Sequence, residues 1–346
     1  MCGSVFVEYI FCQMMNTTGG IVRHVVLVHG DCDGIIAGAL FVKHFLRDQY
    51  PSDILLGFTQ PWRASKEIRR LCRENQCDSL TLIDIAIDRE IFSMIVDITM
   101  KGVPIQIIDH HATTEPWVGK MRDLGLKVVW DKSPSTPRLM ASKMKLSINS
   151  YEERLIRVAD TCEGTDDEDE EIKGIADSIK LAISRDPGDI EFMKELFDSI
   201  VLNRDLKSIE SLEKKAYIGK LLLNKLIDKA ISKGENIGEV VLSYIHPSES
   251  RLFAGLFGIA STELSKKLKR DVILVRNEDD KIVVTIRSTK GRALQYCKTL
   301  VEALGGGKYG GHREAASATL AKRDVLEVIA RIRDLVWEIQ RGRERK

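Results

Sequence analysis

The chain has 346 residues, of which 44% are hydrophobic and 30% charged, and its formal net charge is +1 at pH 7. This length suits two domains that each bury their own core. No apolar run approaches the roughly 20 residues that a membrane-spanning helix needs, so we expect no membrane protein. The near-zero net charge does not exclude binding of nucleic acid, because acidic residues elsewhere on the surface can offset the charge of a basic groove.

The cysteines are odd in number and are not paired at metal-binding spacings, which predicts free thiols in a reducing compartment and therefore a cytoplasmic protein. They are Cys2, Cys12, Cys32, Cys72, Cys77, Cys162 and Cys297. Residues 1–20 have neither a basic start nor a convincing cleavage site and are interpreted as an N-terminal extension.

Three apolar runs rich in β-branched residues predict buried parallel strands at 22–28, 80–85 and 103–108. The segments between and after them have helical periodicity, at 35–48, 65–75 and 90–101. The resulting βαβαβ order predicts an α/β fold with a doubly wound, mainly parallel sheet, here assigned to residues 21–185.

A helical connector is predicted at 186–235, and its long amphipathic segment ends at Gly234. A smaller α/β domain is then predicted at 236–346, where helices alternate with strands. Its expected strands are 239–245, 272–276 and 281–287, and its expected helices are 252–268, 293–304 and 323–340.

Polar residues follow each predicted strand of the first domain. They are His29-Gly30-Asp31-Cys32-Asp33-Gly34, Asp84 and Asp109-His110-His111, while Asp160 ends a later helical pattern. Parallel strands bring their carboxyl ends to one edge of a sheet, where ligands bind. Carboxylates gathered there repel one another unless they are neutralised, which predicts a pair of divalent cations.

Two neighbouring cations suit phosphoester hydrolysis, because together they generate hydroxide and neutralise the charge on phosphorus. Oxygen and imidazole ligands without a thiolate cluster favour Mn²⁺, with Mg²⁺ or Co²⁺ as substitutes. The second domain carries Gly305-Gly306-Gly307-Lys308-Tyr309-Gly310-Gly311-His312. Glycines let a backbone approach a phosphate closely, and Arg287 could grip one with two hydrogen bonds.

The motifs after the strands of the first domain, which are His29 to Gly34, Asp84, Asp109 to His111 and Asp160, resemble the four successive motifs of the DHH phosphoesterases. The glycine-rich motif with Glu314-Ala315-Ala316, and the preceding Arg287-Ser288, resemble the DHH-associated C-terminal domain. The resemblance covers nearly the whole chain after residue 20. Relatives with this architecture include RecJ-like exonucleases, bacterial nanoRNases and cyclic-dinucleotide phosphodiesterases.

The resemblance implies a role for each matching residue. Asp84 and Asp160 would bridge the metals, His111 would contact the scissile phosphate, and Asp109 would support the cluster. In several relatives the histidine of the first motif lies further ahead of the two aspartates than His29 does. In the RecJ-like pattern an aspartate takes the place of this histidine. The implied metal ligands are His29, Asp31, Asp33, Asp84, His110 and Asp160. The implied phosphate-binding residues are Arg287, Gly306, Gly307, Gly310, Gly311 and His312.

The function expected from these features is Mn²⁺-dependent 3′ to 5′ hydrolysis of single-stranded RNA or DNA, or of short oligonucleotides, releasing nucleoside 5′-monophosphates. One alternative is a phosphoesterase for phosphoadenosine phosphate or cyclic dinucleotides, and another is a non-catalytic replication or repair scaffold. A homodimer and a replication or repair partner protein are both compatible with the resemblance. Basic residues of one predicted helix, Arg63, Lys66, Arg69 and Arg70, either contact a phosphate backbone or form a solubilising surface. An aromatic content of 6% gives no expectation of a base-stacking platform.

Overall fold

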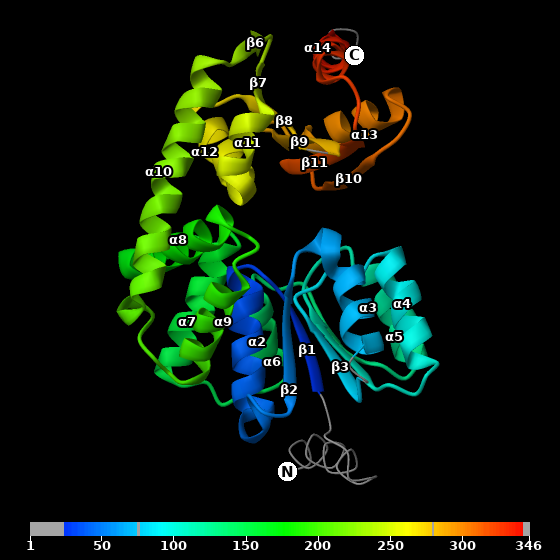
Figure 1. Cartoon of the computed structure of the whole chain (residues 1–346), viewed down its shortest axis with the longest axis vertical. Coiled ribbons are helices and arrows are strands. Elements are labelled where there is room, and N and C mark those ends of the chain that lie inside the picture. Colours follow the sequence, from blue (N-terminus) through cyan, green and yellow to red (C-terminus); the bar gives the residue numbers. More distant parts are fainter. Residues whose placement is uncertain (1–23, 75–76, 279, 342–346) are drawn as a thin grey trace. The chain divides into compact units, whose positions relative to one another are not determined.

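The computed structural model describes residues 24–74, 77–278 and 280–341 (Figure 1). Contacts divide the chain into two compact units. Of the described residues, those at 24–29 and 33–152 belong to the first unit, and those at 30–32 and 153–341 belong to the second.

The first unit contains a parallel five-stranded sheet with the order β2-β1-β3-β4-β5. Strands β2 and β3 lie on opposite sides of β1, so the chain reverses its direction of winding between β1 and β3. This arrangement confirms the predicted doubly wound parallel sheet. The strands are β1 (His24–His29), β2 (Ile54–Thr59), β3 (Ser79–Ile83), β4 (Ile105–Asp109) and β5 (Lys127–Trp130).

Helices lie on both faces of this sheet (Figure 1). Val25 and Leu27 of β1 pack in one apolar cluster with Ile68 of α3, Ile91 of α4 and Met121 of α5. Strands covered on both faces need apolar side chains at successive positions, which explains the continuous apolar run of β1. The helices of this unit are α2 (Cys32–Phe45), whose first residue belongs to the second unit, α3 (Ala64–Glu74), α4 (Arg89–Thr99), α5 (Val118–Asp123) and α6 (Thr136–Lys143).

Strands β2 and β5 were not predicted from the sequence. β5 has only four residues, and glycine interrupts the apolar run of β2 at Gly57. A Cβ atom at Gly57 would lie 2.9 Å from Leu71 Cδ1. The glycine therefore lets α3 pack closely on the strand.

Helices fill the first part of the second unit and extend into its sheet domain. The long helix α10 packs against α8 and α12. A Cβ atom at Gly219 of α10 would lie 2.6 Å from the Leu181 carbonyl oxygen, so glycine permits the close approach to α8. The helices are α7 (Ser150–Cys162), which begins just before the unit boundary, α8 (Glu170–Arg185), α9 (Ile190–Val201) and α10 (Glu210–Ser232).

The second sheet has the order β10-β11-β9-β8-β7-β6, with β7 and β8 parallel and the other neighbours antiparallel. One face packs against α13 and α14, and the other packs against α10 and α12. The strands are β6 (Glu235–Ile237), β7 (Val240–Ile245), β8 (Asp271–Asn277), β9 (Lys281–Arg287), β10 (Lys308–Gly311) and β11 (Ala315–Ala321). The helices are α11 (Pro247–Phe253), α12 (Phe257–Leu268), α13 (Ala293–Ala303) and α14 (Val325–Arg341).

Strands β10 and β11 were not among the strands expected from the sequence. The second half of the glycine-rich segment is the edge strand β10, which forms a hairpin with β11. Its glycines do not follow the alternation of apolar and polar residues that marks a strand in sequence. Within the described residues, every helix is too short or too polar to span a membrane.

Candidate metal centre

The polar residues singled out in the first unit gather where its central strands end. His29 is the last residue of β1, and Asp84 directly follows β3. Asp109 is the last residue of β4, and His110 and His111 come next. Because β1 and β3 flank the point at which the winding reverses, this edge is where a doubly wound sheet binds its ligands.

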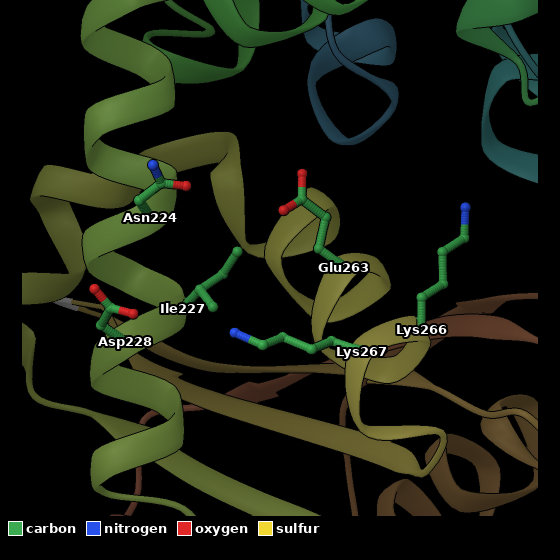
Figure 2. Close-up of a pocket in the computed structure, with 6 residues that line it drawn as sticks. All are labelled: Asn224, Ile227, Asp228, Glu263, Lys266 and Lys267. Carbon is green, nitrogen blue, oxygen red and sulfur yellow. The ribbon is translucent and has the colours of Figure 1, made fainter.

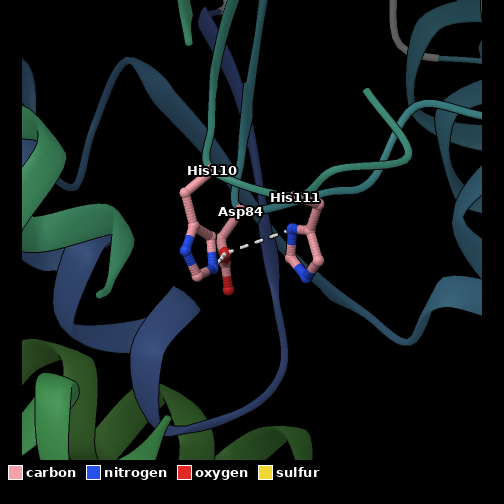
Figure 3. A group of neighbouring side chains, drawn as sticks. All are labelled: Asp84, His110 and His111. Carbon is pink, nitrogen blue, oxygen red and sulfur yellow. Dashed lines mark ion pairs between the residues drawn. The ribbon is translucent and has the colours of Figure 1, made fainter. Parts of the chain in front are cut away.

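Two groups of side chains at this edge could hold a metal ion. One consists of Asp84, His110 and His111, and the other of His29, Asp31 and Asp84. Within each group, one ligand atom per residue lies within 4.8 Å of the others. Figure 3 shows the side chains of the first group converging on one space. Asp84 belongs to both groups, which is the arrangement expected of a carboxylate that bridges two cations.

The backbone of Asp84 is held in an uncommon conformation. Its φ is 60°, in the left-handed region that costs a non-glycine residue about 1–2 kcal/mol. The Asp84 N–H nevertheless continues the sheet by donating to the Ile108 carbonyl over 2.8 Å. Strain of this kind is common at functional sites, where it aims a side chain that a regular strand would direct elsewhere.

His110 has the geometry of a metal ligand. Its Nδ1 lies 3.0 Å from the Ser133 carbonyl oxygen, which can only accept, so Nδ1 carries the proton and Nε2 keeps its lone pair. Nε2 lies 3.4 Å from Asp33 Oδ2 and 3.5 Å from Asp84 Oδ1. This nitrogen is buried and has no hydrogen-bond partner among the described residues. A divalent cation bound by Nε2 and both carboxylates would satisfy it, so these residues fit the metal that the sequence predicts.

Asp33 and the following glycine show why the first motif has this composition. Asp33 lies in the first turn of α2, is fully buried, and accepts a hydrogen bond from the Thr136 N–H over 3.1 Å. A Cβ atom at Gly34 would lie 2.3 Å from the His29 carbonyl oxygen. Only glycine therefore allows the start of α2 to fold back onto the end of β1.

His111 is arranged differently from His110. Its side chain is 36% exposed, compared with 10% for His110, and its Nδ1 lies 2.6 Å from Asp109 Oδ1. Burial by itself lowers the pKa of His111, but the hydrogen bond to Asp109 and the charges of Asp109 and Asp84 raise the pKa to about 9. Asp109 is held by a second hydrogen bond from Thr114 Oγ1. His111 can thus present a cationic imidazole to solvent, as a group that contacts a phosphate requires.

The remaining predicted ligands are positioned as follows. His29 Nδ1 lies 3.4 Å from Asp84 Oδ2, and Asp31 occupies the turn between β1 and α2. Asp160 lies near the end of α7 and is 7% exposed. Within the described residues Asp160 is in neither of the two groups, so its role as a bridging ligand stays a prediction.

The first motif also carries a covalent crosslink. Cys32, between Asp31 and Asp33, forms a disulfide with Cys162, two residues after Asp160, across a sequence separation of 130. The expectation of free thiols is therefore wrong for this pair, because spacing along the chain does not reveal cysteines that folding brings together. Cys72, Cys77 and Cys297 are free, while Cys2 and Cys12 lie outside the described residues.

Three residues between the end of β5 and the start of α6 support the cluster and were not predicted from the sequence. Thr136, at the start of α6, donates through Oγ1 to Asp84 Oδ1 over 2.8 Å as well as through N–H to Asp33. Ser133 orients His110, and Trp130 Nε1 donates to the His111 carbonyl over 2.9 Å. The only local signal was Ser135-Thr136-Pro137, a helix-start pattern that does not by itself indicate a ligand-supporting role.

The second unit brings its own predicted anion-binding residues together. Arg287 ends β9 and is the register partner of Ala315 on β11, while the His312 N–H donates to the Ala315 carbonyl. Arg287 Nε donates to Thr262 Oγ1 over 2.8 Å, and burial lowers the pKa of the guanidinium. Among the described residues no carboxylate pairs with Arg287, which leaves a half-buried cation suited to an anionic ligand.

The glycine hairpin next to Arg287 is exposed along its length. Gly306, Gly307 and Gly311 have positive φ values of 145°, 138° and 121°, which only glycine adopts readily. Gly310 has an ordinary φ, and His312 Nδ1 lies 3.0 Å from Glu314 Oε2. The hairpin thus presents backbone groups and one imidazole to solvent.

A separate hollow of 670 Å³ lies between α10 and α12 (Figure 2). In Figure 2, Lys267 extends toward Ile227 and Asp228, while Lys266 points away from them. Acidic and basic side chains line the hollow together, so its charge does not favour an anion over a cation. Its lining residues are Asn224, Ile227, Asp228, Glu263, Lys266 and Lys267.

Comparison with known proteins agrees with this geometry. Residues 238–340 match the family model of the DHHA1 domain. RecJ from Thermus thermophilus, solved in complex with Mn²⁺, superposes with a TM-score of 0.64 at 17% identity, covering 97% of this chain and 54% of that one. The chain thus spans about half of the length of that RecJ. No curated protein matches the chain.

Two further structures share the fold. The DHH domain of a member of a ribosomal protein family has a TM-score of 0.62 at 17% identity, covering 91% of this chain and 86% of that one. A pGpG-specific phosphodiesterase, PggH from Vibrio cholerae, has a TM-score of 0.58 at 12% identity, covering 90% of this chain and 98% of that one.

Fold and site together define a two-unit α/β protein with an aspartate and histidine metal centre. Residues 238–340 form a DHHA1 domain, and the fold of the chain is similar to that of RecJ and of other DHH proteins of known structure.

Proposed function

We propose that this protein is a Mn²⁺-dependent phosphodiesterase that hydrolyses single-stranded RNA or DNA, or short oligonucleotides, in the 3′ to 5′ direction and releases nucleoside 5′-monophosphates. The observation that carries the proposal is the position of Asp84, which belongs to both metal-binding groups. A carboxylate shared in this way is what a pair of cations acting on one phosphate needs.

The side chains of the metal centre have distinct tasks in this reaction. Asp33 and Asp84, which both lie within 3.5 Å of His110 Nε2, would hold one cation together with His110. His29, Asp31 and Asp84 would hold the other. A bound cation pair supplies a hydroxide nucleophile and neutralises charge on the phosphate. His111 remains at the solvent side of the cluster, where its imidazolium can donate a hydrogen bond to a phosphate oxygen while Asp109 holds the ring.

The second unit supports an anionic substrate through its own residues. Arg287 is a half-buried guanidinium without a carboxylate partner among the described residues, and Thr262 fixes its orientation. A guanidinium oriented in this way can bind a phosphate through two parallel hydrogen bonds. The exposed glycine hairpin adds backbone N–H donors that no side chain shields.

The test is hydrolysis of end-labelled single-stranded RNA and DNA of graded length with Mn²⁺, comparing wild type with His110→Ala and Asp84→Ala. We expect stepwise release of mononucleotides, and a loss of at least about a thousandfold in kcat for either variant, since each removes a metal ligand. Asp88→Asn is the matched control, because Asp88 caps α4 four residues after Asp84 and asparagine caps a helix equally well. Release from the 5′ end would reverse the proposed polarity.

A second candidate function is hydrolysis of a small phosphoester such as phosphoadenosine phosphate or a cyclic or linear dinucleotide. The likeness to PggH over nearly its whole length favours including these substrates in the same assay. Turnover of a dinucleotide but of no longer oligonucleotide would replace the leading proposal with this one. Absence of turnover on every substrate would favour a scaffold.

A further inference from the structure

An exposed tryptophan lies close to the metal centre within the first unit. Trp62 is 70% exposed and belongs to a short 3₁₀ turn, Pro61–Arg63, between β2 and α3. It makes no ring contact or hydrogen bond with any residue in the described part of the chain. A large aromatic side chain left in water at this edge has no role in the core.

The sheet register limits how far Trp62 can lie from the cluster. Thr59, the last residue of β2, is the parallel partner of His29. Neighbouring strands are about 4.8 Å apart and three residues span at most about 11 Å, so the Cα atom of Trp62 lies within about 16 Å of that of His29. A few nucleotides of a single strand cover this distance.

A hydrogen bond brings the same segment next to the loop that carries Asp84. Ser65 Oγ, at the start of α3, donates to Glu90 Oε1 at the start of α4 over 2.8 Å. The segment that contains Trp62 therefore lies beside the loop that links Asp84 to α4. Both segments leave the sheet at its carboxyl edge.

The surroundings of Trp62 favour a negatively charged partner. Arg63, Lys66 and Arg89 are exposed at the starts of the two helices. The acidic groups nearby are already engaged: Asp88 accepts from the Ile91 N–H, Glu90 accepts from Ser65, and Glu67 pairs with Arg70. An aromatic side chain among cations is the combination with which proteins bind single-stranded nucleic acid.

We propose that Trp62 is a base-stacking subsite, on which a nucleobase of a single-stranded substrate lies while a phosphate up to a few nucleotides along the same strand is held at the metal centre. The proposal rests on the proposed phosphodiesterase function and deepens it, because it requires a substrate that carries bases. Arg63 and Lys66 would contact the backbone of the same strand. A polyphosphate or any other baseless phosphoester would gain nothing from this subsite.

The test compares Trp62→Ala, Trp62→Phe and Tyr217→Ala in the Mn²⁺-loaded full chain. Tyr217 is a matched control because it is an aromatic residue of 67% exposure on α10. Stacking of one base changes affinity by about 5- to 150-fold, so we expect Trp62→Ala to raise KM for a pentanucleotide within this range and to change kcat by less than about twofold. Trp62→Phe should retain most of the affinity.

A pentamer of abasic sugar phosphates separates stacking from other contacts. With this substrate the wild type should show the raised KM, and Trp62→Ala should raise it no further. An unchanged KM for Trp62→Ala on the base-bearing pentamer, or an equal loss on the abasic one, overturns the subsite.

Binding measured without turnover separates this proposal from the proposed function. Fluorescence anisotropy of a labelled pentanucleotide, with EDTA present, reports affinity even if the chain hydrolyses nothing. A weaker affinity of Trp62→Ala in a protein without hydrolytic activity supports the subsite and rejects the phosphodiesterase. Equal affinities of Trp62→Ala and wild type, in an active enzyme, reject only the subsite.

Discussion

The two candidate sites of this protein are built in opposite ways. At the metal centre Asp33 and Asp84 are almost fully buried, and the surrounding backbone and Thr136 hold them in place. At the anion site of the second unit the glycine hairpin is exposed along its length, and Arg287 has a hydroxyl partner but no carboxylate among the described residues. The first site concentrates negative charge, whereas the second offers positive charge and N–H donors.

This difference is the one expected if the first site binds a cation pair and the second binds a phosphate, as proposed above. A cation pair is small and needs ligands fixed within tenths of an ångström, which packing and hydrogen bonds supply. A phosphate on a flexible strand must enter and leave, and an open backbone surface allows this. Changes confined to one site should therefore leave the other unaffected.

The largest effect is expected from breaking the disulfide that begins inside the first motif. Cys32→Ser should lower the free energy of unfolding by about 2–5 kcal/mol, because the crosslink closes a long loop in the unfolded chain. Urea denaturation with and without dithiothreitol measures this loss. The reductant should destabilise wild type and leave Cys32→Ser unchanged, and a wild type that is insensitive to the reductant would show that the crosslink contributes nothing.

The second-largest effect is expected from metal addition, which should stabilise the folded protein. Mn²⁺ at a hundred times its Kd is expected to add about 2.7 kcal/mol to the free energy of unfolding, because the cations bind only the folded cluster. Calorimetric melting with Mn²⁺ or EDTA provides the measurement. The shift should disappear in His110→Ala and persist in Asp88→Asn, and a shift of the same size in both variants would place the metal elsewhere.

In the glycine hairpin, two adjacent glycines give a matched pair. A Cβ atom at Gly311, where φ is 121°, would lie 2.3 Å from the Ala315 carbonyl oxygen, whereas one at Gly310 meets nothing within 4 Å. Gly311→Ala should therefore cost about 1–3 kcal/mol of stability. Gly310→Ala should cost almost none, and similar unfolding midpoints for the two variants would contradict this account of the hairpin.

The smallest effect tests how finely the metal centre is held. Thr136→Val keeps the shape of the side chain but removes the hydroxyl that donates to Asp84, so Mn²⁺ affinity should fall about tenfold. Titration calorimetry measures the change. Thr136→Ser should restore most of the affinity, and a loss that serine does not restore would indicate that the methyl group matters rather than the hydrogen bond.

The sequence predicted those parts of the fold whose signal is local. β1, β3 and β4 are mostly apolar because both faces of the sheet are covered, and the polar residues after them mark the sheet edge. β2 was not predicted because Gly57, which is needed for close packing against Leu71, interrupts the apolar pattern of the strand. β10 was not predicted because its glycines give the strand no apolar periodicity.

The candidate site was predictable to a similar degree. Asp84, His110 and His111 follow strands directly, so the strand prediction locates them. Thr136 reaches the cluster from the start of α6, 52 residues after Asp84, and nothing near it in sequence indicates its partners. Trp62 was missed for another reason: a low overall aromatic content says nothing about where a single aromatic residue lies.

The Cys32–Cys162 disulfide also changes the topology of the molecule, because it closes the chain between these residues into a covalent ring. The ring contains nearly all of the first unit, including Asp33, Asp84, His110 and His111. A single proteolytic cut inside the ring leaves both fragments joined through sulfur. The protein would therefore run as one species on a non-reducing gel and as two after reduction, and a cut within the first unit need not separate the metal ligands from one another.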